Sequence, residues 1–302
     1  MSFVFGPVPS RRLGVSLGID IVPRKYCTLD CIYCEVCKTD NLTIEQEDYY
    51  DINEIINEVK EKYLPLKDSL DVVTITGSGE PTLNKSIDVI VKKLKTFVTH
   101  PIALLTNSTL FYDEEVRQKV KIFDIIVPSL DAANEKIFKK INKPSKEINF
   151  SRMIEGLITF SNEYRGKLIL EILLLEGVNE HQEHLDQLVE IIKNMKYDIV
   201  QLNTAFRPTA YKNVKRLDDI QLLDIALFFN EKGVKVEPVK NFISKNIPKN
   251  IMNDIFNKML NMRPLSENDI VELFGEAFLK NLSQNTSLEI FKYNGETFFK
   301  KI

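Results

Sequence analysis

Short runs of β-branched and aliphatic residues alternate with amphipathic stretches along the first 240 residues. The apolar runs lie at residues 15–21, 71–76, 102–106, 125–129, 168–174 and 199–203, with a shorter seventh run at 234–236. The amphipathic stretches lie between them, at residues 52–63, 85–98, 114–120, 149–163, 181–195 and 218–231. A strand-then-helix repeat is typical of right-handed βαβ units on a parallel sheet. The pattern therefore predicts an α/β fold, a partial (β/α)6 barrel over residues 1–240, with its chemistry at the C-terminal ends of the strands.

The pattern changes after about residue 240. Residues 249–260, 267–274 and 276–282 have helical character, and Ser266 is placed to cap the second of these helices. Asn294-Gly295 then separates two alternating runs, 288–293 and 296–301, which is the strongest short-range hairpin signal. Three helices followed by a hairpin predict a small winged-helix-like domain over residues 241–302.

Composition and charge narrow the class of protein. The 302 residues are 44% hydrophobic and 27% charged, which is ordinary for a globular protein. The most apolar segment, residues 168–175, is far shorter than the ~20 residues of a membrane-spanning helix. No basic stretch followed by an apolar one opens the chain, and four cysteines of which three are clustered do not form a disulfide framework. With a net charge of −3, these features predict a cytoplasmic protein with no membrane partner and no overall attraction to polyanions.

Three of the four cysteines lie within eight residues, at Cys27, Cys31 and Cys34. Three thiolates on one loop can hold three irons of a four-iron cluster and leave the fourth iron open to an exchangeable ligand. The same three cysteines with Cys37 are also compatible with a structural zinc site, which takes four Cys or His ligands. The loop follows the first predicted strand, where a β/α barrel places its active site, and this position favours the cluster.

Small and polar residues follow the other predicted strands. Gly77 and Gly79 let the backbone approach a ligand closely, and Glu80 comes next at the same strand end. A glycine-rich turn before the following helix explains this segment equally well. Glu171 lies among aliphatic residues, where an unpaired carboxylate is costly to bury, so we expect either a basic partner or a ligand role. The other candidate binding residues, at strand ends or in the cysteine loop, are Tyr33, Asn107, Ser129, Asp131 and Asn203.

Several charged residues lie near the predicted site. Arg24 and Lys25 precede Cys27, where positive charge favours thiolates. Arg207 follows the sixth predicted strand and is placed to bind a substrate anion. Cys37 has no partner that the sequence identifies; we favour a bystander thiol over a hydrogen-atom donor.

The cysteine loop, with an aromatic residue before its last cysteine, resembles the signature of the radical S-adenosylmethionine (SAM) superfamily. Gly-Ser-Gly-Glu-Pro-Thr-Leu at 77–83, Thr-Asn-Ser at 106–108 and Arg-Pro at 207–208 extend the resemblance to one group within it. That group comprises iron–sulfur oxidoreductases related to the tRNA wybutosine-pathway synthase. The resemblance covers the predicted barrel and, more loosely, the tail.

The resemblance implies a radical-SAM-type barrel with a [4Fe-4S] cluster on Cys27, Cys31 and Cys34. It implies that SAM binds the open iron and is cleaved reductively to a 5′-deoxyadenosyl radical, with electrons from a reductant such as flavodoxin or ferredoxin. The segment 77–81 would bind the SAM amino group, the polar strand ends its ribose and carboxylate, and Tyr33 its adenine.

The resemblance leaves the substrate open. The wybutosine synthase is understood to need a second cluster, and Cys37 alone cannot hold one, so we do not expect that reaction. Residues 266–283 carry four acidic side chains against Lys280, unlike a helix that reads a phosphate-lined groove. We predict a radical SAM enzyme that takes hydrogen from an RNA base or a protein or peptide substrate. The alternatives are a glycyl-radical-enzyme activase and a zinc-stapled winged-helix DNA-binding regulator.

Overall fold

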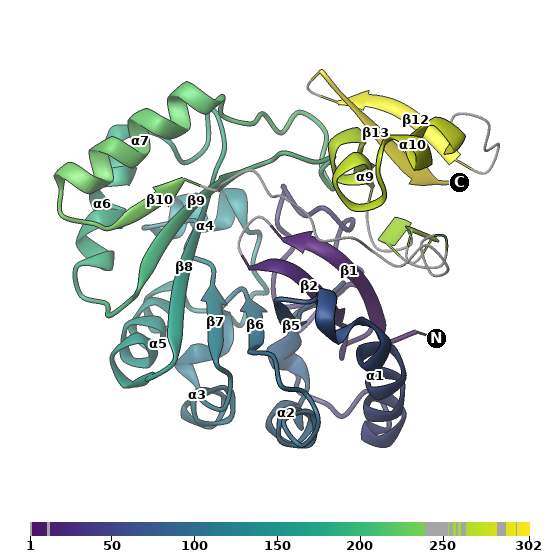
Figure 1. Ribbon diagram of the computed structural model, residues 1–302. Helices are drawn as coiled ribbons and strands as arrows, with labels where there is room; N and C mark the ends of the chain where they lie inside the picture. The colour runs from purple at the N-terminus through teal and green to yellow at the C-terminus, as the bar shows by residue number, and fades with distance from the viewer. Residues whose placement is uncertain are drawn as a thin grey trace.

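A curled, mostly parallel sheet forms the centre of the molecule. The computed structural model describes residues 2–10, 13–238, 253, 256–257, 259–260, 264–282, 288–293 and 295–302. Its eight-stranded sheet has the order β1-β2-β5-β6-β7-β8-β9-β10 (Figure 1). These strands are β1 (Val4–Ser10), β2 (Gly14–Ile19), β5 (Val72–Ile75), β6 (Ile102–Thr106), β7 (Ile125–Pro128), β8 (Lys167–Leu174), β9 (Ile199–Thr204) and β10 (Val236–Pro238). All neighbours pair in parallel except β1 and β2, which form an antiparallel hairpin.

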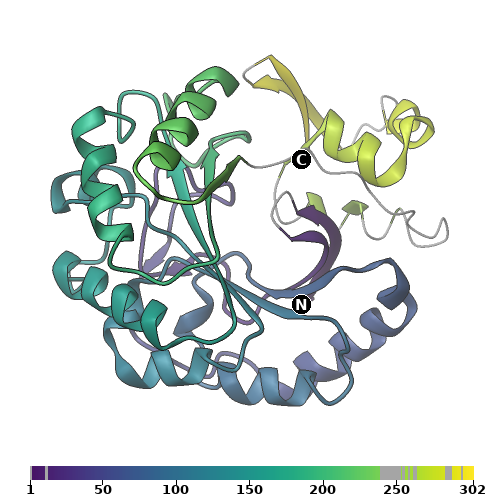
Figure 2. The same ribbon diagram turned by 60° about the vertical axis from the view of Figure 1, so that its left-hand side comes forward.

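Helices cover the outer face of this sheet (Figure 2). They are α1 (Ile52–Leu66), α2 (Ile87–Leu94), α3 (Glu114–Val120), α5 (Phe150–Glu163), α6 (Gln182–Ile192) and α7 (Asp219–Glu231), with the short α4 (Glu135–Ile141) after β7. Each longer helix buries one stripe; α1, for example, buries Ile55, Val59 and Tyr63 at intervals of four residues. None of the helices described is long and apolar enough to cross a membrane.

The predicted α/β fold with a partial barrel is confirmed, and each predicted strand overlaps an observed one. Besides two-residue strands, the prediction missed strand β1 and helix α4. Strand β1 contains Pro7 and Pro9, which weaken a strand pattern, but it is the edge strand of the sheet, where proline is tolerated. Helix α4 has only seven residues, too few for a helical period to stand out.

The inner face of the curled sheet changes from aliphatic to polar towards the C-terminal ends of the strands. Val127, Ile169 and Ile199 pack together as a small inner cluster. Because side chains in a strand alternate between faces, the residues two positions later, Ser129 and Glu171 among them, face the same way. The strand ends therefore present polar groups to a common interior, as a barrel active site requires.

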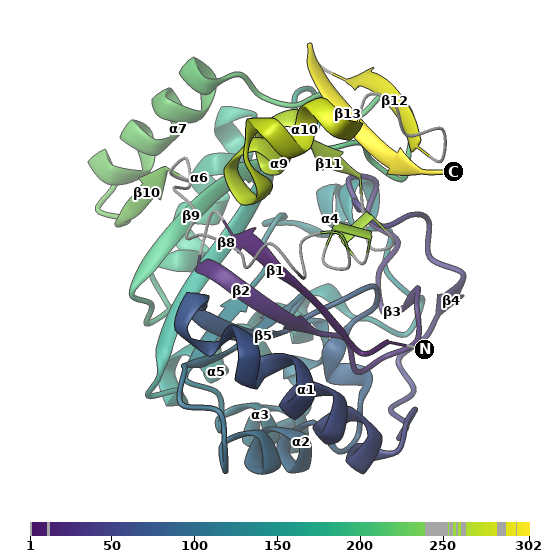
Figure 3. The same cartoon turned by 45° about the vertical axis from the view of Figure 1, so that its right-hand side comes forward.

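The C-terminal unit, residues 264–302 as described, is a small antiparallel sheet with two helices. It comprises β11 (Leu265–Ser266), α9 (Glu267–Phe274), α10 (Glu276–Leu282), β12 (Leu288–Tyr293) and β13 (Glu296–Lys301), with strand order β11-β13-β12. The helices predicted at residues 267–274 and 276–282 and the hairpin are confirmed. Ser266 caps α9 by accepting a hydrogen bond from the Asp269 amide at 3.1 Å. Figure 3 shows the unit beside the β1–β2 hairpin.

Other predictions for the tail are not settled by this unit. The predicted helix at residues 249–260 lies mostly outside the described residues. The boundary near residue 240 also lies outside them, so the division into two domains stays a prediction. The winged-helix assignment stays a prediction as well, because a three-stranded sheet with two helices does not by itself define that fold.

Candidate functional site

The cysteine loop lies between β2 and α1, at the C-terminal edge of the sheet. Cys27 ends the short strand β3 (Tyr26–Cys27), which pairs in parallel with β4 (Asn41–Leu42) and so draws the two ends of the loop together. The amide of Cys34 donates to the carbonyl of Cys31 at 3.1 Å, and the amide of Ile32 donates to Ile141 at the end of α4 at 2.9 Å. Backbone hydrogen bonds therefore hold the loop both internally, between Cys34 and Cys31, and against the end of α4.

Each of the three clustered thiols has its own N–H donor. Lys25 Nζ lies 3.3 Å from the sulfur of Cys34. The side-chain amide of Asn142 lies 3.4 Å from that of Cys31, and the amide of Asn107 lies 3.5 Å from that of Cys27. N–H groups directed at sulfur are the interactions by which a protein tunes an iron–sulfur cluster.

The three thiols form the donor set that a four-iron cluster takes from a protein when one iron is left for an exchangeable ligand. Such a cluster takes each thiolate on a different iron. Burial, with a smaller effect from Glu80, raises the pKa of Cys27 to about 12, and burial raises the pKa of Cys31 as well. Metal binding must therefore displace protons from these thiols.

Asp131 joins the cysteine loop to the sheet. Its carboxylate accepts hydrogen bonds from the Tyr33 hydroxyl, from the side-chain amide of Asn142 at 2.9 Å and from the amide of Leu173 at 2.9 Å. The residue is buried, and burial raises its pKa to about 6. Tyr33, predicted to contact adenine, thus has its hydroxyl engaged by Asp131.

The raised pKa of Asp131 predicts a pH dependence of stability in the metal-free protein. The folded chain holds this proton up to about pH 6 and the unfolded chain only to about the ordinary value of 3.8. The folded state therefore binds more protons in this window, so its free energy of unfolding falls as pH rises from about 4 to 6, by roughly 2–3 kcal/mol. Urea unfolding at several pH values should show this slope in the wild type and a shallower one in Asp131→Asn, in which the raised pKa of Glu80 still contributes. An equal slope in both proteins would contradict it.

The buried Glu80 carboxylate accepts hydrogen bonds from three other residues. One carboxylate oxygen accepts from the amide and hydroxyl of Thr82, at 3.1 and 2.6 Å, and from the hydroxyl of Thr106 at 2.6 Å. The other accepts from the amide of Asn107 at 2.9 Å. Burial raises the pKa of this carboxyl group. Glu80 therefore ties the end of β5 to the end of β6, a role that the sequence did not indicate.

The two glycines before Glu80 allow close packing of the loop on its neighbours. A Cβ at Gly77, where φ is +152°, would lie 2.2 Å from the carboxyl carbon of Asp20. A Cβ at Gly79 would lie 2.4 Å from the carbonyl oxygen of Tyr26. The close backbone approach predicted at these glycines is therefore made, at least in part, to Asp20 and Tyr26 of the protein itself.

The predicted site residues gather around two spaces. Asn107, Ser129 and Asp131 line a small space beside the cysteine loop. Gly77 and Asn203 line a larger cavity of about 300 Å³. Glu171 lines neither; its carboxylate accepts from the amide of Asn203 at 2.7 Å. The basic partner or ligand role expected for Glu171 stays a prediction.

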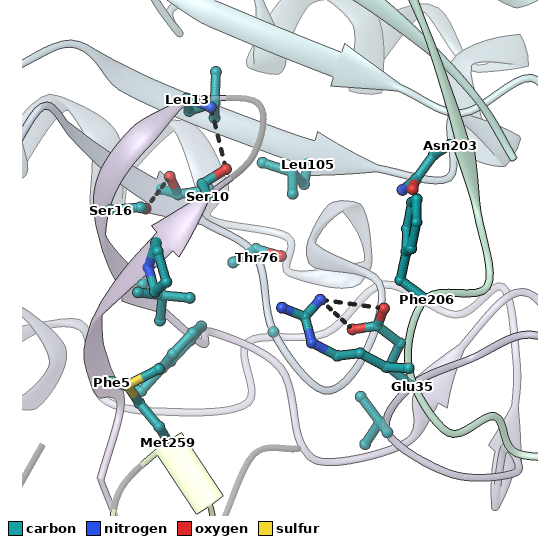
Figure 4. Close-up of a pocket in the computed structure, with 17 residues that line it drawn as sticks. Phe5, Ser10, Leu13, Ser16, Glu35, Thr76, Leu105, Asn203, Phe206 and Met259 are labelled. Atoms are coloured by element: carbon teal, nitrogen blue, oxygen red, sulfur yellow. Dashed lines mark hydrogen bonds and ion pairs between the residues drawn. The ribbon is translucent and has the colours of Figure 1, made fainter. Parts of the chain in front are cut away.

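The larger cavity lies inside the curled sheet (Figure 4). Ser10, Ser16 and Phe5 from the β1–β2 hairpin form one wall, and Asn203 and Phe206 lie opposite. Its full lining is Phe5, Val8, Pro9, Ser10, Leu13, Ser16, Gly18, Glu35, Val36, Thr74, Thr76, Gly77, Leu105, Asn203, Phe206, Arg207 and Met259. The sequence did not identify the hairpin residues, because β1 was not recognised as a strand.

Two further predictions concern Arg207 and Cys37. Arg207, expected to bind a substrate anion, is instead paired with Glu35 and Asp269. The sulfur of Cys37 lies 4.0 Å from the guanidinium of Arg24. Gln201 lies in the same strand as Asn203, and its buried side-chain oxygen has no hydrogen-bond partner in the described part of the chain.

Comparisons with known proteins agree with this site. The profile described as Radical SAM superfamily matches residues 21–192. The chain is 33% identical to a UPF0026 protein of Methanocaldococcus jannaschii, across 100% of this chain and 96% of that protein. It is also 39% identical to a Brachyspira hyodysenteriae protein named GTPase Obg, across 85% of this chain but only 38% of that much longer protein.

Two solved structures have a similar fold. A radical SAM methyltransferase from Sphaerobacter thermophilus superposes with a TM-score of 0.60 at 16% identity, across 74% of this chain and 65% of that one. TYW1 with a lysine-pyruvate adduct bound superposes with a TM-score of 0.56 at 14% identity, across 98% and 82%. At such low identity the likeness concerns the fold alone, so the finer resemblance to the wybutosine-related group stays a prediction.

Proposed function

Because the chain belongs to the radical SAM superfamily and to the UPF0026 family, we propose that it removes a hydrogen atom from an RNA base or from a protein or peptide substrate. It is an enzyme of that superfamily, and its cofactors are a [4Fe-4S] cluster and SAM. When bound, they supply reductive cleavage of SAM to a 5′-deoxyadenosyl radical. The electron donor we propose is a flavodoxin or a ferredoxin.

The observation that carries this proposal is the arrangement of the three thiols. Cys27, Cys31 and Cys34 lie at the C-terminal edge of a partial barrel, and each sulfur has an N–H donor of its own. The proposed roles of the chain follow from this geometry. Lys25, Asn107 and Asn142 orient the three thiolates, while Asp131 and Glu80 hold the loop and the strand ends in place.

The proposed SAM-binding residues are the polar groups at those strand ends. They are Tyr33, Gly77, Gly79, Glu80, Asn107, Ser129, Asp131, Glu171 and Asn203. Asn107, Ser129 and Asp131 line one space beside the cysteine loop, but at about 10 Å³ it has room for about one water, so their proposed contacts with SAM rest on their place at the strand ends. For Tyr33, Gly79 and Glu80, whose contacts are with protein groups, the proposed contribution is to shape the site.

The cavity supports a substrate that inserts a single group. At about 300 Å³ it is at the small end of ligand sites, and its walls combine aromatic residues with hydroxyl and amide groups. Because Gly77 and Asn203, two of the proposed SAM-binding residues, line this cavity, SAM itself would occupy part of it, and the substrate would add one base or one side chain beside SAM. A glycyl-radical activase fits the same cofactors, but no described feature favours it. A zinc-stapled regulator would use the same three thiols with Cys37 as a fourth ligand, and the match to the radical SAM superfamily favours the cluster.

Metal analysis of the anaerobically reconstituted chain tests this proposal. We expect about four irons per chain, on alternate corners of a cubane with sulfide on the others, and the broad brown absorption of an iron–sulfur cluster. Stoichiometric zinc without iron would contradict it and would favour the regulator. Exposure to air should bleach the absorption while leaving the far-ultraviolet circular dichroism of the fold in place.

A further inference from the structure

A buried arginine connects three separate parts of the fold. Arg207 follows β9, and its guanidinium lies 3.1 and 3.0 Å from the two carboxylate oxygens of Asp269 in α9. The same group lies 3.4 Å from both carboxylate oxygens of Glu35. The exposed fraction of the side chain is 12% for Arg207 and 8% for Asp269, against 37% for Glu35.

The two partners of Arg207 come from the segment after the cysteine loop and from the C-terminal unit. Glu35 directly follows Cys34, the third cysteine of the loop. Asp269 belongs to the capping box of α9, so it is fixed to the first turn of the C-terminal unit. Near Arg207, the amide of Ala210 donates to the carbonyl of Cys34 at 2.8 Å. One short segment after β9 therefore holds the cysteine loop with its backbone and with a side chain.

The same residues form part of the cavity. Glu35 and Arg207 both line it, and Figure 4 shows Glu35 on the side of Phe206. Met259, from the tail that leads into the C-terminal unit, lines it as well. Displacing the C-terminal unit would therefore alter a wall of the cavity as well as the segment after Cys34.

We infer that Arg207 is a positioning residue that fastens the C-terminal unit to the cysteine loop. In doing so it fixes the segment after Cys34 and one wall of the cavity. The part of this inference that concerns the cluster rests on the proposed function. The part that concerns the C-terminal unit does not, because it can be measured in metal-free protein.

Burial distinguishes this contact from an ordinary surface ion pair. Lys215 and Glu176 lie 3.7 Å apart near the same segment, but their side chains are 70% and 46% exposed. Exposed pairs of that kind contribute little to stability. Arg207 is different, because its guanidinium directs Nη2 at the buried Asp269 and Nη1 at Glu35, and a lysine has one nitrogen where the guanidinium has two. Since Asp269 is more buried than Glu35 and lies closer, α9 should depend on Arg207 most strongly.

Hydrogen exchange tests the fastening in the metal-free, full-length chain. In Arg207→Ala we expect the amides of α9 to exchange on the order of 100-fold faster than in wild type, because removing one partner of a buried ion pair is strongly destabilising. Arg207→Lys and Asp269→Asn, which preserve size, should show a smaller increase in the same helix. Lys215→Ala is the matched control and should leave α9 unchanged. Unchanged exchange in all three test variants would overturn the inference.

Electron paramagnetic resonance tests the effect on the cluster. We expect the reduced, reconstituted Arg207→Ala and Glu35→Gln proteins to show an altered spectrum, or an altered spectral change on adding SAM, while Lys215→Ala matches wild type. Faster exchange in α9 with wild-type spectra in both variants would overturn the link to the cysteine loop. If wild type itself binds no four-iron cluster, the proposed function fails, and the hydrogen-exchange result still decides whether Arg207 fastens the C-terminal unit.

Discussion

Replacing Cys31 with alanine should abolish iron binding and SAM cleavage together. Each of the three clustered thiols is assigned to one iron, so replacing Cys31 leaves one iron of the cluster without its protein ligand. Changes to groups that only orient a metal ligand typically cost 10–100-fold in affinity or activity, so we expect a loss of at least about 100-fold from removing the ligand itself. Iron content, the cluster absorption and 5′-deoxyadenosine release measure this loss.

Cys37→Ala is the matched control for that experiment. It removes a thiol from the same loop, three residues beyond Cys34. The sulfur of Cys37 lies 4.0 Å from the guanidinium of Arg24. We expect it to retain about four irons and near-wild-type release of 5′-deoxyadenosine. Loss of the cluster in Cys37→Ala with retention in Cys31→Ala would contradict the assignment of the ligands.

Replacing Glu80 should destabilise the chain even without metal or SAM. In Glu80→Ala, four donors lose their acceptor: two on Thr82, one on Thr106 and one on Asn107. Leaving a buried donor unsatisfied costs about 1–3 kcal/mol, so we expect the free energy of unfolding to fall by at least about 3 kcal/mol. Glu80→Gln should lower the free energy of unfolding as well, because the NH2 group of glutamine would face some of these donors and cannot accept their hydrogen bonds. Urea unfolding of the metal-free protein is the measurement.

The control for Glu80 is an exposed acidic residue. Glu45 lies on the surface, and Glu45→Gln should change the free energy of unfolding by less than about 0.5 kcal/mol. The comparison also separates two roles for Glu80. A carboxylate that served only to bind SAM would leave the unfolding of the metal-free, SAM-free chain unchanged when replaced, and that outcome would contradict the structural role.

The sequence predicted the parts of the fold that depend on local pattern. The alternation of apolar runs and amphipathic stretches was enough to place the strands and the outer helices within a few residues. Ser266 and Asn294-Gly295 marked the helix start and the hairpin of the C-terminal unit, because capping and tight turns depend on neighbouring residues. The spacing of the cysteines identified the cluster loop for the same reason.

The sequence did not predict what depends on contacts between distant residues. Arg207 meets Glu35 across 172 positions and Asp269 across 62, and no local pattern connects them. Asn142, which donates to the sulfur of Cys31 across 111 positions, was missed for the same reason. Glu80 was correctly noticed at a strand end, but only its hydrogen bonds reveal that it joins β5 to β6.

The most direct test of the proposed chemistry is the product of SAM cleavage. Anaerobically reconstituted wild-type protein, given SAM and dithionite, should release 5′-deoxyadenosine and methionine, and Cys31→Ala prepared in parallel should release neither. Chromatography with mass spectrometry identifies both products. A wild-type protein that carries about four irons but leaves SAM intact under these conditions would contradict the account that Cys27, Cys31 and Cys34 hold a SAM-cleaving cluster.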